Sequence, residues 1–321
     1  MAFRFKLNEA VQKGFRRIGL EQIERAERQL ATLEDPGAAI HETRKSLKRI
    51  RALLRLARAG LGESVFRAEN ARFRAIAALL SPARDSQILL ATVAKLESLP
   101  GQVTNAALAA ARKIIMEDLD RTEAARNDCI TAALAKLATA KKRLRRLTLK
   151  PAEFSTIERG LEQNYRNGQR AFAAAYSAGG DEAFHEWRKT VQQHWRHMAL
   201  VSRTWPELFN ARVAAARALS QILGDDHDLS VLVAFVRSLP ADRLSALHVR
   251  EIERRVRARQ KQLRKAAEPR GRQLFAEGAK GHSRRISVMW EAAEQMDEGE
   301  EEVTDTASPA GEKAQASKAH S

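Results

Sequence analysis

One pattern occurs twice in this sequence, and it constrains the fold more than any other feature. HETRKSLKRIRALLRL spans residues 41–56, and HEWRKTVQQHWRHMALVSR spans residues 185–203. At about 100° per residue, the first stretch places its apolar side chains on one face of a helix and its basic side chains on the opposite face. A single basic face is usually only a solvated surface, but its repetition indicates an internal duplication.

Other marks recur at nearly the same offset. SPARDSQILL and LGDDHDLSVL align Asp85 with Asp228, and GFRR corresponds to NYRN. Arg74 and Arg217 each lie eleven residues before the aligned aspartates. The sequence therefore predicts a duplicated helical unit of about 145 residues. We expect two halves and a disordered acidic and polar tail, at residues 1–150, 151–295 and 296–321.

Composition favours helix nearly throughout. Aromatic residues make up only 5% of the chain, and glycine and proline are few. Helices joined by short loops pack antiparallel, so we expect an all-α fold of two four-helix bundles related by a pseudo-two-fold axis. Gly224 followed by Asp225 predicts the end of one helix and the cap of the next. The periodic segments predict helices over 6–33, 38–59, 63–80, 82–98, 104–147, 153–178, 181–204, 207–223, 226–238, 242–267 and 271–294.

The charge of the chain is unevenly distributed. The formal net charge is +16, but residues 291–321 hold nine acidic residues and two lysines, which leaves +23 on residues 1–290. So basic a body indicates a polyanionic partner. One cysteine, Cys129, excludes an internal disulfide and a multi-cysteine metal site. We find no apolar span for a membrane helix or a signal peptide, so we expect a cytoplasmic protein without membrane insertion.

The repeated motifs resemble the conserved histidine α-helical domain, or CHAD, family over roughly residues 5–290. The resemblance rests on H-x-x-R-K-x-x-K-R-x-R in the first half, on H-E-W-R-K in the second, and on the R-D and L-G-D-D-H-D-L elements. It implies a central channel between the two bundles, lined by basic residues, that binds inorganic polyphosphate. Carried over by position, it nominates His41, Arg44, Lys45, Lys48, Arg49, Arg51, Arg55, His185, Arg188, Lys189 and Arg196.

The repeated face and the aligned arginines add Arg74, Arg203 and Arg217 to these candidates. Gln192 and Gln193 stand where basic residues are expected, so the second wall should bind less tightly. Polyphosphate carries negative charge on nearly every unit and has no bases to read. Its site therefore needs repeated cations, with lysine as a compact charge and arginine as a forked donor.

Two other functions stay open at the level of sequence. A nucleic-acid-binding helical protein would share the basic charge, but single-stranded sites usually add aromatic platforms, and only Trp195 lies at the edge of a basic face. We expect Trp187, Trp205 and Trp290 to be packing residues. An HD-like metal phosphohydrolase could use His227 and Asp228, but Arg84 occupies the position equivalent to His227. His194 and His197 point toward the apolar side of their helix, which indicates packing. We therefore expect a non-catalytic polyphosphate-binding protein without cofactor or metal, associated with polyphosphate granules; the sequence sets no oligomeric state.

Overall fold

The computed structural model describes residues 3–32, 35–99, 105–123 and 126–306, and within these ranges it leaves out the side chains of residues 82–85, 120–123, 126–127 and 298–306. The described residues form helices and no strand, which confirms the all-α prediction. The helices are α1 (Val11–Ala31), α2 (Pro36–Leu56), α3 (Arg58–Leu61), α4 (Glu63–Leu79), α5 (Pro82–Glu97), α6 (Ala106–Glu123), α7 (Arg126–Leu144), α8 (Phe154–Ser177), α9 (Asp181–Leu200), α10 (Pro206–Ser238), α11 (Ala246–Leu274) and α12 (Ala279–Thr306).

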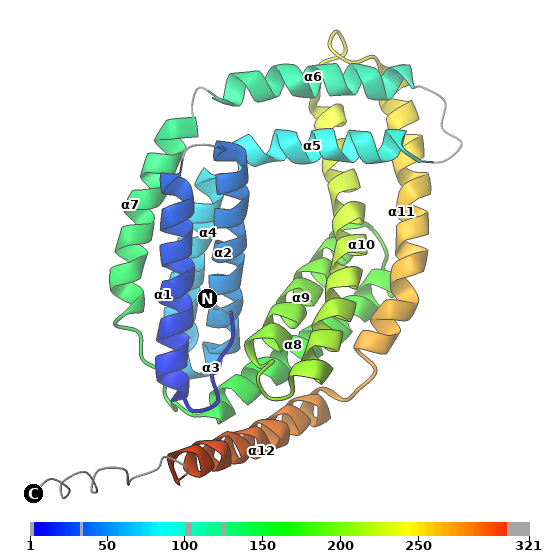
Figure 1. Cartoon of the computed structure of the whole chain (residues 1–321). Helices are drawn as coiled ribbons and strands as arrows, with labels where there is room; N and C mark the ends of the chain where they lie inside the picture. The colour runs from blue at the N-terminus through cyan, green and yellow to red at the C-terminus, as the bar shows by residue number, and fades with distance from the viewer. Residues whose placement is uncertain (1–2, 33–34, 100–104, 124–125, 307–321) are drawn as a thin grey trace, which may run out of the picture.

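The helices form two side-by-side groups that are bridged by α5 and α6 (Figure 1). In the first group, α1 packs against α2 and α7, and α4 packs against the same two helices. In the second group, α9 lies between α8 and α10, while α12 packs along α8. Helix α2 joins the two groups, because it contacts both α8 and α9.

The apolar core combines residues from both halves of the chain. The bridging helices α5 and α6 pack against α10 and α11, where Val93, Leu108, Leu232 and Ile252 are buried together. The large core under α1, α2 and α4 also takes in Trp290 of α12. Neither half therefore buries its apolar faces alone, and the relative position of α2 and α9 is fixed by packing on several sides.

Two predicted helix boundaries are wrong. The segment predicted as one helix over 104–147 contains two helices, α6 and α7. Conversely, α10 is continuous through Gly224, where a break was expected. Glycine weakens a helix without forbidding it, and the expected cap residue Asp225 instead accepts hydrogen bonds from Lys95 of α5 and from Gln221.

The end of the chain also differs from the expectation. Helix α12 continues to Thr306, whereas the disordered tail was predicted to begin at residue 296; residues 307–321 lie outside the described residues. Helix α11 runs on through Pro269 to Leu274, although its predicted end was residue 267. Among the described helices, none contains a stretch apolar and long enough to cross a lipid bilayer.

Candidate anion-binding site

Helix α2 presents its basic face toward α9 because its apolar face is used up in the core. Asp35 caps its first turn by accepting a hydrogen bond from the Ala38 amide at 3.0 Å, and Pro36 occupies a position where no amide donor is needed. Leu47, Ile50 and Leu53 are fully buried. The basic residues on the opposite face of α2 therefore lie beside the second half of the protein.

Helix α9 is built in the same way. It begins after Gly180, whose φ of 84° is a conformation that glycine adopts without strain. Its apolar side buries Trp187, Val191 and Met198, and it also buries His194 and His197, as their positions on the helix predicted. The Nε2 atom of His197 lies 3.0 Å from the Ala52 carbonyl oxygen of α2, which ties the two helices together.

The facing sides of α2 and α9 bring cations from both halves into one electrostatic cluster. Burial lowers the pKa of Arg196 to about 9, and Arg49 and Arg188 act in the same direction. Burial likewise lowers the pKa of Arg188. These guanidinium groups still carry their charge at neutral pH, because even a pKa of about 9 lies well above 7. The cluster therefore combines like charges that repel one another in a partly dehydrated space.

Lys48 stands at the centre of this cluster. Its side chain is exposed to water, yet the surrounding protein lowers its pKa to about 7, first by desolvation and then through Arg196, Arg188 and Arg44. Asp228 raises the pKa of Lys48, but it does not offset the contributions that lower it.

The cations of the cluster have almost no carboxylate partners. Among the described side chains, no ion pair within 4.0 Å is formed by Lys48, Arg49, Arg51, Arg55, Arg188 or Arg196. They make neutral contacts instead: Arg51 Nε donates to Asn70 Oδ1 at 3.0 Å, and Arg49 donates to Gln22 Oε1 at 3.3 Å. The Nε atoms of Arg188 and Arg196 are buried without a hydrogen-bond partner. A buried donor without a partner costs about 1–3 kcal/mol, so this site favours an added acceptor.

Trp195 orients two of the arginines. The guanidinium of Arg196 lies 4.2 Å from its ring centroid, and that of Arg217 lies 4.6 Å from the same centroid. Cation–π contacts of this kind are worth about 0.5–2 kcal/mol. Trp195, predicted at the edge of the basic face, therefore holds these two arginines beside the cluster.

The LGDDHDL motif distributes its four polar side chains among different helices. Asp225 pairs with Lys95 of α5 at 2.7 Å, and Asp226 pairs with Arg264 of α11 at 2.8 Å. The ring of His227 stacks on that of His185 of α9, with centroids 4.0 Å apart. Asp228 faces the cluster, where burial raises its pKa and Arg188 lowers it. The predicted first-turn position of Asp228 is wrong, because α10 continues through it.

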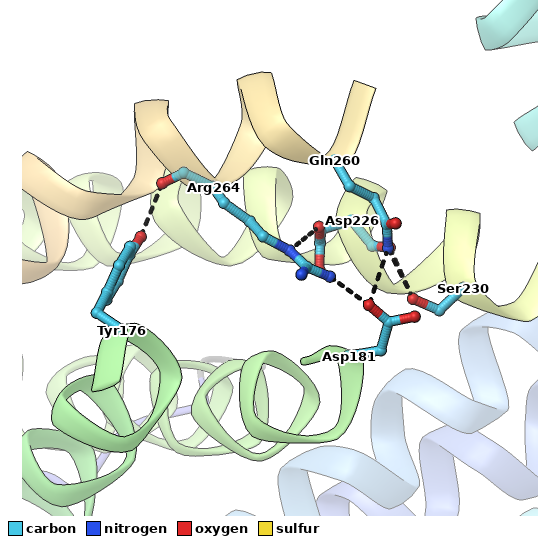
Figure 2. Close-up of polar contacts among 6 residues, drawn as sticks. All are labelled: Tyr176, Asp181, Asp226, Ser230, Gln260 and Arg264. Atoms are coloured by element: carbon cyan, nitrogen blue, oxygen red, sulfur yellow. Dashed lines mark hydrogen bonds and ion pairs between the residues drawn. The ribbon is translucent and has the colours of Figure 1, made fainter. Parts of the chain in front are cut away.

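A partly buried polar network positions the beginning of α9 (Figure 2). Arg264 of α11 bonds Asp226 and also Asp181, the first residue of α9, at 2.5 Å. Gln260 donates to Ser230 at 2.9 Å and to Asp181 at 3.5 Å. The network therefore fixes α9, α10 and α11 relative to one another. It also separates Asp226, which points into the network, from His227 and Asp228 on the cluster side.

The other predicted site residues differ in their contacts and exposure. Arg44 donates to the Ala77 carbonyl at 2.9 Å and to Ser81 Oγ at 2.7 Å, so Ser81 contacts Arg44 and makes no side-chain capping bond to α5. Lys45 and Lys189 are exposed and pair with Glu42 and Glu186 of their own helices. His41 is half-buried near the start of α2, where it lowers the pKa of Glu42.

Arg74 acts on Arg51 of the cluster through like-charge repulsion. Arg203 lies in the turn after α9. The side chain of Asp85, the predicted counterpart of Asp228, lies outside the described residues. Trp205 was expected to pack inside the protein, but 51% of its surface is exposed.

Sequence reasoning did not identify the supporting network. Arg264, Gln260 and Asp181 carry no repeated motif, and each resembles the ordinary polar surface of a helix. The only available signal was Asp226, a second aspartate within DDHD that has no counterpart in the first half. A carboxylate that α10 buries almost completely requires a cation, and α11 supplies it.

The histidines of the second half do not converge on a common centre. His185 and His227 stack at the cluster, while His194 packs against Tyr165 and His282 in the interior. Burial lowers the pKa of His227 to about 3 and that of His282 to about 4. Among the described residues, no group of three or more histidine, cysteine, aspartate or glutamate side chains is arranged to hold a metal ion.

Comparison with known proteins gives one positive result. The CHAD domain family matches residues 17–237, a segment that begins within α1 and ends within α10. It includes both basic faces and the LGDDHDL motif. A search among curated proteins found no match. Because the matched segment covers more than half of the sequence, this chain belongs to the CHAD domain family.

Proposed function

We propose that this protein binds inorganic polyphosphate between α2 and α9, without catalytic activity of its own. The observation that carries the proposal is the cluster of cations that lack described carboxylate partners, Lys48, Arg188 and Arg196 foremost among them. A protein that gathers like charges in a partly dehydrated space lowers its own stability. A bound polyanion removes that cost, because it supplies negative charge and hydrogen-bond acceptors together.

The shape of the proposed site is the channel that the family resemblance implies. Helices α2 and α9 would form its two walls, related by a pseudo-two-fold axis that also relates the two predicted bundles. Lys48 is exposed to water at this place, so a polyanion can reach it from solvent. Arg51 and Arg55 continue the basic face of α2 along the helix, and burial lowers the pKa of both.

The same geometry favours polyphosphate over single-stranded nucleic acid. Nucleic-acid sites of that kind stack bases on exposed aromatic rings. The Trp195 ring at this cluster is covered by Arg196 and Arg217, and the Phe3 ring lies beneath Arg49. Inorganic polyphosphate needs no stacking surface, and forked guanidinium donors match its oxygen atoms.

The hydrolase alternative gains no support from the histidines. An HD-type centre needs histidine and aspartate ligands around one metal. His227 pairs with His185, whereas Asp226 is taken by Arg264 and Asp225 by Lys95. We therefore assign His185 and His227 to the wall of the anion site, where each neutral ring can donate one hydrogen bond, from its protonated nitrogen, to a phosphate oxygen.

A competition experiment tests the proposal. Labelled long-chain polyphosphate is bound to the full-length protein and then displaced by unlabelled polyphosphate, RNA, DNA or heparin at equal concentrations of anionic groups. We expect polyphosphate to displace the label at a concentration at least tenfold lower than the other polymers require. Equal displacement by nucleic acid would overturn the specificity. A Lys136→Ala protein is the matched control, because Lys136 is an exposed lysine of α7 without an ion pair in the described structure.

Association with polyphosphate granules follows from the same proposal. A fluorescent fusion of the wild-type protein should co-localise with granules, and the Arg188→Ala variant should lose that localisation. Uniform fluorescence of the wild-type fusion in granule-containing cells would overturn this extension, while leaving the binding measured in solution unaffected.

A further inference from the structure

A second basic cavity opens at the far end of α2. Its volume is about 470 Å³, and α2, α3, α4 and α8 supply its walls. Three arginines line it, Arg55 from α2, Arg58 from α3 and Arg159 from α8. Glu63 is the one carboxylate among the lining residues. The cavity therefore carries a net positive charge.

The arginines of this cavity are held by the fold. Arg58 pairs with Glu63 at 2.6 Å and lies over the ring of Phe66 at 4.8 Å from its centroid. Behind them, α8 approaches α2 so closely that a Cβ atom at Gly160 would lie 2.0 Å from the Leu56 carbonyl oxygen. Such a close backbone contact needs glycine, and it fixes the wall that carries Arg159.

Two of the three cations of this cavity are not paired with a described carboxylate within 4.0 Å. Arg55 and Arg159 form no ion pair in the described part of the chain. Burial, together with repulsion from Arg51 and Arg58, lowers the pKa of Arg55 to about 10. Arg51 in turn acts on Arg196, so the repulsion runs without interruption from the central cluster to this cavity. Arg44 and Arg55 stand eleven residues apart on α2, which corresponds to about 16 Å along the helix axis.

The other half of the repeat does not reproduce this cavity's charge. The duplication places Ala199 at the position of Arg55 and Ser202 at that of Arg58. By the alignment of GFRR with NYRN, Glu9 takes the position of Arg159, and it is paired with Arg17 at 2.7 Å. The basic tract therefore continues beyond the centre toward one end only.

We propose that this cavity is a phosphate-binding subsite at which a chain held in the central cluster continues past Arg55 to Arg58 and Arg159. The inference rests on the proposed function and deepens it, because it gives the site a direction and a dependence on chain length. A short chain would occupy the central cluster alone, where more cations gather. A long chain would reach the cavity as well and gain the contacts to Arg159.

Binding of two probes to Arg159→Ala tests the subsite. Tripolyphosphate should bind this variant with unchanged affinity, whereas long-chain polyphosphate should bind roughly tenfold more weakly, as expected for the loss of one charge-assisted contact. Arg159→Lys should recover most of that loss. Arg170→Ala is the control, because Arg170 is exposed on the same helix and also lacks an ion pair among the described residues.

The outcomes separate the subsite from the function. Unchanged affinity of Arg159→Ala for the long chain would overturn the subsite, and so would an equal loss for both probes. Failure of the wild-type protein to bind either probe would instead overturn the proposed function. Thermal unfolding of each variant without ligand checks that the fold is intact, and Arg58→Ala provides a second, independent removal of a cation from the same cavity.

Discussion

Raising the pH from 7 to 8.5 is expected to weaken polyphosphate binding, because Lys48 loses its proton over this range. In the ligand-free protein, desolvation and neighbouring arginines lower its pKa to about 7. A bound polyanion would favour the charged ammonium and raise that pKa again. Binding therefore takes up a proton above pH 7, and affinity is highest below pH 7 and falls as the pH increases.

The magnitude follows from how far the pKa recovers. The Lys48 side chain is exposed, and screening by water reduces the effect, so we take a recovery of about one to two pH units. Linkage then gives an affinity about 4- to 12-fold lower at pH 8.5 than at pH 7. Long chains at constant ionic strength are the appropriate ligand, since few of their phosphates are terminal groups that titrate in this range.

Calorimetric titrations at both pH values, in buffers of different ionisation enthalpy, measure the affinity and the proton uptake together. A Lys48→Arg protein keeps its charge across the range, so its affinity should be nearly independent of pH. Lys136→Arg, which changes an exposed lysine of α7 in the same way, should behave as wild type. The reasoning is refuted if wild-type affinity stays constant between pH 7 and 8.5, or if Lys48→Arg shows the same fall.

Three further outcomes concern stability. Long-chain polyphosphate at 100 times its Kd should stabilise the protein by about 2.7 kcal/mol; an unchanged Tm would contradict binding to the folded state. Arg264→Ala leaves the buried Asp226 without its cation, so chemical unfolding should show a free energy of unfolding lower by about 3 kcal/mol. A decrease below about 1 kcal/mol would contradict a stabilising role of the network. Gly160→Ala should lower the free energy of unfolding by at least about 2 kcal/mol, because its Cβ meets the Leu56 carbonyl. Gly224→Ala, which has ordinary space inside a helix, should raise it by up to about 1 kcal/mol. Equal effects of the two substitutions would contradict the packing described.

The basic faces of the two repeated helices could be predicted because helical periodicity separates apolar from charged positions. Leu47 and Val191 are buried where the pattern placed them, and so are His194 and His197. The pairing of α2 with α9 could not be derived from the residues alone, since periodicity gives the face of a helix but not its partner. Only the family resemblance pointed to a shared channel.

The misassigned positions have local physical causes. Gly224 and Asp225 carry the signals of a helix end, but α10 continues because packing against α5, α9 and α11 supports it on several sides. Arg203 was placed on the basic face by extending the α9 periodicity, yet the helix ends at Leu200. Trp205 was assigned to the interior by its apolar character, although it precedes Pro206 at the exposed start of α10.

The weaker binding expected of the second half because of its two glutamines stays a prediction. Gln192 and Gln193 removed two expected cations, but Arg196 and Arg188 are among the most strongly desolvated cations of the cluster. Which arginine is free to bind depends on the carboxylates that surround it. That information lies in the tertiary contacts, and the sequence motif does not contain it.

The central claim is that cations from both halves bind one polyphosphate chain, and the affinities of Lys48→Ala, Arg188→Ala and the double variant test it most directly. Each single variant should bind long-chain polyphosphate about 10- to 100-fold more weakly, as expected for charge-assisted contacts. The double variant should bind almost none, while Lys136→Ala binds as wild type. An Arg188→Ala protein with unchanged affinity would contradict the shared site and confine binding to the first half.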